Sequence, residues 1–241
     1  MGPTMGELLV TLIPVALGVV LSPLAIMALV AVLLSRRASA NGIAFLIGWV
    51  VGLAGLLTLA LWLFTVFEVH GLREPPLWVP ILRLLIGLFL AGAAVWVYRK
   101  GSARIRQMAA ASSPQQVVAA APQLPGWLHA VETFRPVRTG FLGLALFVLN
   151  PVDASCAIIA ALDISLAQVG DDAVWVALAF VVVGTLPIAV PVFYVAIRGE
   201  RSQPLLDSAR RWVAGNTHVM NAALLLVIGA LQLQKGISGL L

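Results

Sequence analysis

Charged residues are scarce in this sequence. Asp, Glu, Lys and Arg together make up 10% of its 241 residues, whereas a water-soluble domain carries roughly 25%. The single cysteine, Cys156, excludes an internal disulfide and the paired thiols of a redox relay. The three histidines, His70, His129 and His218, are scattered and lack the spacing of metal ligands. We therefore expect neither a metal site nor a cofactor.

Sequence motifs of enzymes are lacking as well. Neither the His-Glu-x-x-His pattern of metalloproteases nor the Gly-x-Ser-x-Gly pattern of serine hydrolases occurs. At about 20 apolar residues per membrane-spanning helix, the chain has room for roughly six spans but for no sizeable soluble domain. The protein is therefore not expected to be an enzyme.

Apolar residues, by contrast, dominate the chain. They make up 61% of it, and the mean hydropathy is +1.03, which is typical of an integral membrane protein. Six apolar stretches are long enough to cross a bilayer. They cover approximately residues 8–34, 42–67, 80–98, 139–166, 173–197 and 216–233. We therefore predict an all-α integral membrane protein with six transmembrane helices.

The basic residues fall on one side of these spans. The turn 35–41, the segment 99–138 and the loop 198–214 hold twelve of the fifteen Lys and Arg residues. Because cytoplasmic loops carry such an excess, we predict that these segments are cytoplasmic and that both termini are extracytoplasmic. The net charge of +5 is therefore a topology signal, and no nucleic-acid partner is expected.

Short sequence echoes recur in the same order in the two halves of the chain. The pairs are Leu21-Ser22-Pro23 with Leu149-Asn150-Pro151, Val50-Val51-Gly52 with Val182-Val183-Gly184, and Leu85-Ile86-Gly87 with Val227-Ile228-Gly229. With three spans in each unit, the second copy must be inverted in the membrane, a plan that recurs in secondary transporters. We therefore divide the chain into a three-helix repeat (1–98), a cytoplasmic linker (99–138) and a second three-helix repeat (139–241).

The linker ends in a short amphipathic pattern. Trp127, Leu128, Val131 and Phe134 recur at helical spacing just before the fourth span. This pattern predicts an interfacial helix that rests on the bilayer. An unstructured linker is the alternative.

A polar residue followed by proline interrupts the first and the fourth span near their middles. Proline disrupts a helix interior but suits the first position of a helix, with Ser or Asn before it as N-cap. Ser22-Pro23 and Asn150-Pro151 are therefore predicted to begin new half-helices, whose positive ends converge on one buried cavity. The alternative is that both prolines only kink packed helices.

Asp153 is the ionisable residue that we expect deepest in the membrane. A carboxylate there is costly unless it is paired, hydrated or protonated. Its functional interpretation is that it couples transport to protons or contacts a headgroup. The alternative, which does not exclude the first, is a local cap of the half-helix at the capping-box position. Asp163, near the outer end of the same span, is expected at the membrane interface.

Small residues and prolines suggest where helices pack or bend. Gly48 and Gly52, like Gly87 and Ala91, have the small-x-x-x-small spacing that lets helices approach closely. Packing within one chain is the first interpretation, and a homodimer is the second. In the fifth span, Gly184, Thr185, Pro187 and Pro191 suggest a hinge or a broken segment, with a tolerated kink as the alternative.

The Leu21-Ser22-Pro23 motif and the continuous stretch 33–52, which contains Arg36, Arg37 and Asn41, resemble the glycolipid-addressing (GAP) proteins of mycobacteria and other actinobacteria. This family includes the sulfolipid-addressing protein and is similar to the lysine-exporter (LysE-like) superfamily. The resemblance implies an inner-membrane protein that assists export of a cell-envelope glycolipid, beside a larger lipid transporter. It also implies that Ser22, Pro23, Asn150 and Pro151 line the central site. Val152-Asp153 stands where the wider superfamily often has a basic residue.

Three functions follow from these features. The first is a transporter or transport accessory for an envelope glycolipid, in contact with membrane lipids. The second is a proton-coupled exporter of an amino acid or another small solute, which Asp153 would serve. The third is a structural scaffold for a larger lipid transporter.

Overall fold

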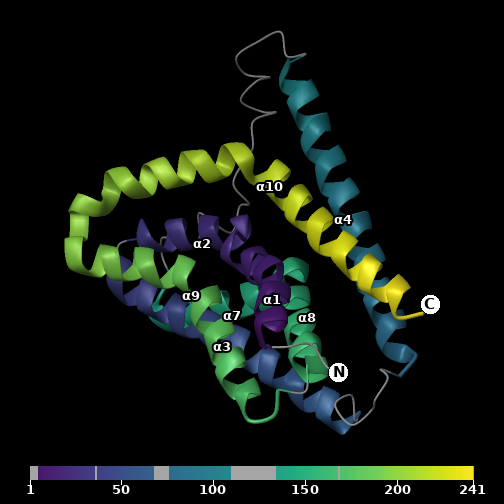
Figure 1. The fold of residues 1–241 in the computed structure, drawn as a ribbon. Coiled ribbons are helices and arrows are strands. Elements are labelled where there is room, and N and C mark those ends of the chain that lie inside the picture. The colour runs from purple at the N-terminus through teal and green to yellow at the C-terminus, as the bar shows by residue number, and fades with distance from the viewer. Residues whose placement is uncertain (1–4, 36, 68–75, 110–133, 168, 241) are drawn as a thin grey trace.

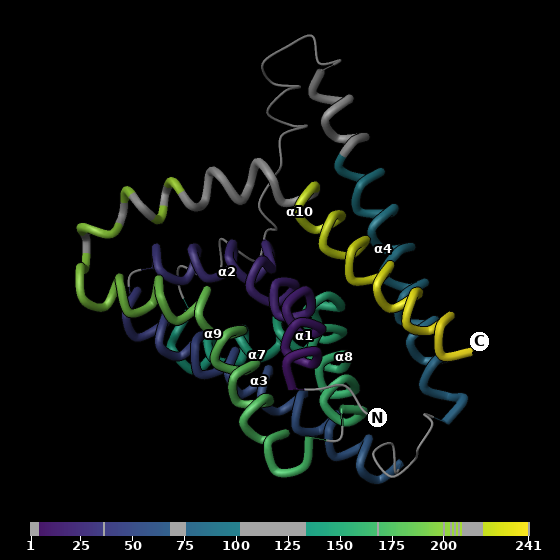
Figure 2. Tube along the Cα trace, in the orientation of Figure 1, coloured from purple at the N-terminus to yellow at the C-terminus, as the bar shows by residue number. Residues whose placement is uncertain are grey.

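The computed structural model describes residues 5–35, 37–67, 76–109, 134–167 and 169–240. In these residues the fold consists of eight α-helices and one short 3-10 helix (Figures 1 and 2). The α-helices are α1 (Met5–Val20), α2 (Pro23–Leu33), α3 (Ala38–Val66), α4 (Trp78–Ala109), α7 (Pro136–Leu149), α8 (Pro151–Ala167), α9 (Asp172–Arg198) and α10 (Gln203–Ser238). The 3-10 helix η2 (Gly199–Ser202) joins α9 to α10. The prediction of an all-helical protein is confirmed for this part of the chain.

The helices are long and apolar enough for a multi-pass membrane protein. Four of them, α3, α4, α9 and α10, contain a stretch that can cross a bilayer singly, and the number rises to six if each of two bent helix pairs is one span. Large apolar side chains such as Trp62, Leu85, Phe141 and Ile197 are exposed on the outside. This arrangement suits a lipid environment, because hydrocarbon chains solvate such side chains at no cost.

Two helix pairs are bent at the predicted interruptions. The axes of α1 and α2 differ by 44°, and those of α7 and α8 by 67°. In each case the second helix begins with a proline, Pro23 or Pro151, whose fixed φ and missing N–H suit the first helical position. The backbone of Ser22 and Asn150 is extended at the breaks, so the chain changes direction there.

Helix α8 occupies the centre of the molecule. Eleven of its seventeen residues are buried, and it packs against α1, α3 and α9. Helix α3 lies along α7, and α4 packs mainly along α10 (Figure 1). The pair α4–α10 thus flanks a central group that contains both bent helix pairs.

Glycines allow the closest helix contacts. A Cβ atom on Gly48 of α3 would collide with the carbonyl oxygen of Gly140 in α7, and one on Gly52 would lie 3.0 Å from the Cβ of Phe147. Gly87 of α4 faces Gly229 of α10. The small-x-x-x-small pairs therefore lie at helix contacts within this chain, as membrane helices use small residues.

The structure differs from the expected elements in two places. Helix α4 continues to Ala109, beyond the expected end of the third span, because no proline occurs between residues 99 and 109. Helix α9 runs unbroken through Pro187 and Pro191, so the broken segment considered there is absent. Of the predicted interfacial helix, only Phe134 lies within the described residues; it is half-buried and precedes α7.

Candidate functional site

The two helix breaks meet at a cluster of three polar side chains, Ser22, Asn150 and Asp153, here called the polar cluster. Ser22 is the last residue before α2, Asn150 is the last before α8, and Asp153 lies in the first turn of α8. Residues that are 131 positions apart in the sequence thus contact each other. The breaks bring them together because each proline forces its polar neighbour to the start of a half-helix.

Ser22 and Asn150 both donate a hydrogen bond to the same oxygen of Asp153. The Ser22 hydroxyl donates to Asp153 Oδ2 over 2.9 Å, and Asn150 Nδ2 donates to the same oxygen over 2.6 Å. Asn150 Nδ2 also lies 3.3 Å from Ser22 Oγ. The two contacts to Asp153 Oδ2 have the lengths of well-formed hydrogen bonds.

The carboxyl group is fully enclosed. Asp153 has no exposed surface, and Ser22 is 1% exposed. The second oxygen, Asp153 Oδ1, has no hydrogen-bond partner among the described residues. A buried acceptor without a partner is costly, so this atom is the point of the cluster at which a proton, a water molecule or a ligand donor would bind most favourably.

The two breaks are capped differently. Asn150 Oδ1 accepts a hydrogen bond from the backbone N–H of Val152 over 3.2 Å, as an N-cap residue does. Ser22 stands at the N-cap of α2, but its side chain makes no cap bond; its hydroxyl donates to Asp153. Capping by the Ser22 side chain was therefore a wrong expectation.

Asp153 does not act as a local backbone cap. Its hydrogen bonds go to two side chains, Ser22 and Asn150, and none is made to a backbone N–H of α8 among the described residues. The carboxyl group therefore links one bent helix pair to the other. Pro23 is buried beside the cluster, whereas Pro151 is exposed.

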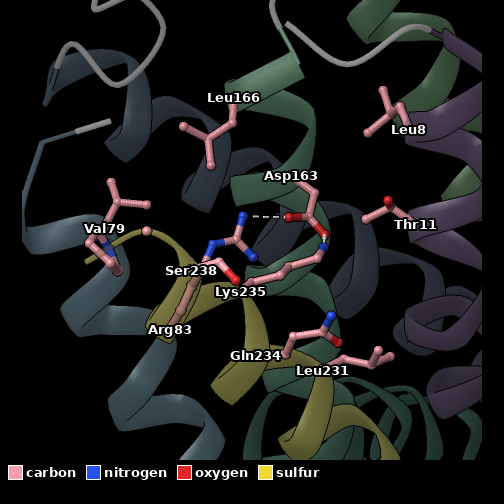
Figure 3. Close-up of a pocket in the computed structure, with 12 residues that line it drawn as sticks. Leu8, Thr11, Val79, Arg83, Asp163, Leu166, Leu231, Gln234, Lys235 and Ser238 are labelled. Carbon is pink, nitrogen blue, oxygen red and sulfur yellow. Dashed lines mark hydrogen bonds and ion pairs between the residues drawn. The ribbon is translucent and has the colours of Figure 1, made fainter. Parts of the chain in front are cut away.

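A second polar group, Arg83, Asp163 and Lys235, here called the charged cluster, lies apart from the first. Arg83 Nη2 is 2.6 Å from Asp163 Oδ1, and Lys235 Nζ is 3.0 Å from Asp163 Oδ2 (Figure 3). Arg83 Nη1 also donates to Gln232 Oε1 over 3.1 Å. Asp163 is 5% exposed and Arg83 7%.

That Asp163 lies at the membrane interface stays a prediction, but its two cationic partners were not predicted from the sequence. Its partners come from α4 and α10, 80 and 72 residues away in the sequence, so only the tertiary fold brings them together. One signal was present in the sequence. Arg83 stands within an apolar span, where an ionisable residue is rare and is usually paired.

The three residues expected in the cytoplasmic turn, Arg36, Arg37 and Asn41, have different outcomes. Arg36 lies outside the described residues, and Arg37 is exposed immediately before α3. Asn41 lies within the first turns of α3, not in the turn, because the helix begins at Ala38. It is fully buried, and its Nδ2 donates to Ser35 Oγ over 2.9 Å and to the Phe134 carbonyl over 3.1 Å. Asn41 therefore ties the start of α3 to the segment before α7.

The predicted bending residues of α9 lie within one continuous helix. Thr185 Oγ1 donates to the carbonyl of Val181 one turn earlier over 2.6 Å. The carbonyl oxygen of Gly184 accepts a hydrogen bond from Trp49 Nε1 over 3.1 Å. Trp49, which the sequence did not single out, thus fixes α9 against α3 and also meets the ring of Phe147 edge-on at 4.9 Å.

Comparison with known proteins identifies a family. A family model described as Sap, sulfolipid-1-addressing protein, matches residues 12–238 and therefore nearly the whole chain. The match includes the polar cluster, the charged cluster and both helix breaks. No curated protein and no solved structure matches the chain.

Proposed function

The chain belongs to the sulfolipid-1-addressing protein family, and we propose that it is an inner-membrane transporter, or an accessory of one, that assists export of a cell-envelope glycolipid. The family is described as lipid-addressing and not as an enzyme family. In this proposal the polar cluster is the central site, and the bent helix pairs are the parts that move. Membrane lipids are the direct partners.

One observation carries the proposal. The enclosed carboxyl group of Asp153 accepts hydrogen bonds from both helix breaks, while its Oδ1 atom has no partner in the part of the chain that the structure describes. A buried acceptor without a protein partner is destabilising, so a proton or a donor from a ligand would stabilise it. Ionisable residues inside membrane proteins mark substrate or proton pathways, and broken helices at the midplane form such sites in transporters.

We also propose that the fold is an inverted repeat, and reciprocal contacts support it. If a two-fold axis relates two repeats, a contact between one residue of the first repeat and one of the second must recur between the equivalents of those two residues. Gly87 of α4 and Gly229 of α10 hold equivalent positions. A Cβ atom on Gly87 would lie 3.0 Å from the Gly229 carbonyl oxygen, and one on Gly229 would lie 3.1 Å from the Gly87 carbonyl oxygen.

A second pair of contacts follows the same rule. Phe147 and Val19 each stand three residues before the polar residue of a helix break. A Cβ atom on Gly52 would lie 3.0 Å from Phe147, and one on the equivalent Gly184 would lie 3.2 Å from Val19. Together with the Asn150–Ser22 contact, these pairs support an axis that passes through the polar cluster.

The experiment that tests the proposed function is deletion of the gene, followed by profiling of the lipids that are extractable from the cell surface. We expect one glycolipid class to fall at the surface and to accumulate inside the cell, and the wild-type gene to restore it. An unchanged lipid profile, with unchanged resistance to envelope stress, would contradict the proposal.

A second candidate is a proton-coupled exporter of an amino acid or another small solute. The unpartnered oxygen of Asp153 favours it, because a buried carboxyl group that gains and loses a proton can couple transport to a proton gradient. Counterflow in proteoliposomes separates the two functions. Saturable amino-acid exchange that Asp153→Asn abolishes would favour the exporter, whereas its absence favours lipid handling.

The orientation in the membrane and the protein partner are also proposed. We propose that both termini are extracytoplasmic, that the basic loops face the cytoplasm, and that a larger lipid transporter is the protein partner. A scaffold for that transporter remains the alternative role. It predicts that removal of the chain lowers the amount of the larger transporter in the membrane, whereas substitutions in the polar cluster leave export unchanged.

A further inference from the structure

A cavity of about 470 Å³ lies beside the charged cluster (Figure 3). Its lining comes from four helices that are distant in sequence, α1, α4, α8 and α10. The lining includes the three charged residues Arg83, Asp163 and Lys235 and the apolar residues Leu8, Val79, Leu166 and Leu231. The volume falls within the range of about 300–1,000 Å³ that is usual for small-molecule sites.

The charges in this cavity do not balance. Arg83 and Lys235 are both cationic, and Asp163 is the one acidic residue among the described residues of the lining. Each Asp163 oxygen is already engaged, Oδ1 with Arg83 and Oδ2 with Lys235. Within the described lining, the charges therefore sum to one excess positive charge in a largely apolar cavity, where an excess charge is costly.

The unbalanced charge is accessible. The side chain of Lys235 is 32% exposed, whereas those of Arg83 and Asp163 are 8% and 4% exposed. The three side chains point into the cavity from different helices (Figure 3). The buried Arg83–Asp163 pair thus fixes the position of the carboxylate, and Lys235 presents its ammonium group where a ligand can reach it.

The cavity also has apolar walls and lies near helix ends. Leu8, Val79, Leu166 and Leu231 surround the charged cluster. Leu8 lies in the first turns of α1 and Val79 is the second residue of α4, whereas Leu166 and Lys235 lie in the last turns of α8 and α10. A cavity that joins one excess positive charge to apolar walls, near the ends of membrane-spanning helices, matches an amphiphile with an acidic headgroup.

We propose that this cavity binds the phosphate or sulfate headgroup of an anionic membrane lipid, which Lys235 and Arg83 hold while the apolar walls contact the acyl chains. The site is separate from the polar cluster, so lipid binding here is independent of whether the polar cluster transports. Ion pairing within the charged cluster accounts for only one of its two cations. A bound anionic headgroup accounts for the other.

The test is lipid binding by the whole purified chain in detergent, measured by native mass spectrometry with phosphatidylglycerol and phosphatidylcholine as probes. We expect wild-type protein to retain phosphatidylglycerol preferentially. Lys235→Gln should weaken that binding roughly tenfold, the loss typical of one charged hydrogen bond. Lys235→Arg should retain the preference, and Lys100→Gln, at an exposed lysine of α4, should leave it unchanged.

Two further measurements make the result decisive. Arg83→Gln breaks a buried ion pair and is liable to unfold the protein, so Lys235→Gln, which leaves that pair intact, carries the test. Inorganic phosphate and sulfate are added as competitors. Weak competition by these ions supports a lipid-borne headgroup, whereas displacement of the lipid at equal concentration would overturn the proposal.

The proposal is also overturned if Lys235→Gln binds both lipids as the wild type does. Asp153→Asn should leave phosphatidylglycerol binding unchanged. Loss of export in Asp153→Asn with normal lipid binding therefore separates a failure at the polar cluster from a failure at this cavity.

Discussion

Asn150 makes three hydrogen bonds with one side chain. Its Oδ1 accepts from the Val152 N–H, and its Nδ2 contacts Asp153 Oδ2 and Ser22 Oγ. A single residue thus caps α8 and joins both helix breaks. At the residue scale, this amide contacts both other members of the polar cluster.

Asn150→Ala should lower the free energy of unfolding by about 2 kcal/mol, because it removes an N-cap bond and leaves Asp153 with one donor. Denaturant unfolding in detergent micelles measures the change. The control is Ser155→Ala one turn later, where no side-chain hydrogen bond is lost among the described residues. Equal stability of the two variants would contradict the role given to Asn150.

Trp49→Phe tests the contact between α3 and α9. It keeps an aromatic ring against Phe147 but removes the donor to the Gly184 carbonyl. We expect a loss of about 1 kcal/mol, the usual net contribution of one buried hydrogen bond. The same unfolding assay applies, and an unchanged midpoint would show that the indole N–H does not stabilise this contact.

The residues that the sequence predicted correctly and those it missed differ in one respect. Pro23 and Pro151 break helices through local chemistry, which is visible in a single sequence. The partners of Asp163 cannot be identified in this way, because Arg83 and Lys235 reach it only through the tertiary fold. For the same reason, the sequence suggested a local cap for Asp153 but not its bond to Ser22.

At the scale of elements, the contact between α3 and α7 depends on glycine. A Cβ atom on Gly48 would collide with the Gly140 carbonyl, and one on Gly143 with the Phe45 carbonyl. Backbone atoms cannot move aside as a flexible side chain can, so the two helices must separate to admit a methyl group.

Gly48→Ala should therefore destabilise the protein by about 1–3 kcal/mol, the range for overpacking. Gly55→Ala in the same helix is the matched control, because a Cβ there meets nothing within 4 Å. It should be neutral or slightly stabilising, since alanine is the better helix former. Comparable losses in both variants would show that the loss does not arise from the α3–α7 contact.

At this scale, the sequence predicted the positions of the apolar helices and of the two breaks. It predicted the ends of the helices and the effect of each proline less well. Pro23 and Pro151 begin new helices, yet Pro187 and Pro191 lie within continuous α9. The former have a polar residue before them that suits a cap, Ser22 or Asn150. The latter follow apolar Leu186 and Val190, which favour continuation of the helix in an apolar setting.

At the scale of the whole molecule, the charge distribution predicts the orientation in the membrane. Cysteines are introduced one at a time by Arg37→Cys and Asp171→Cys, in a chain that also carries Cys156→Ser. Both positions are exposed. An impermeant maleimide added outside should label the Asp171→Cys protein in intact cells but the Arg37→Cys protein only after lysis. The reverse pattern would contradict the proposed topology.

Cys156 reports whether the centre of the molecule opens. It is fully buried one turn after Asp153, so a membrane-permeant maleimide should label it slowly in the conformation described here. A protein that alternates between closed and open forms should react faster when its substrate lipid is being exported. Complete protection under all conditions, with rapid labelling after unfolding, would contradict movement at the polar cluster.

The most direct measurement of the central claim is export by a deletion strain that carries variants of the chain at matched membrane levels. The wild type and Asp172→Asn, which alters an exposed carboxylate at the start of α9, should restore the surface glycolipid. Asp153→Asn should restore less than about a tenth of it, the size of effect expected when one interaction with a charged group is lost. Full restoration by Asp153→Asn would contradict the account, because the enclosed carboxyl group would then have no part in export.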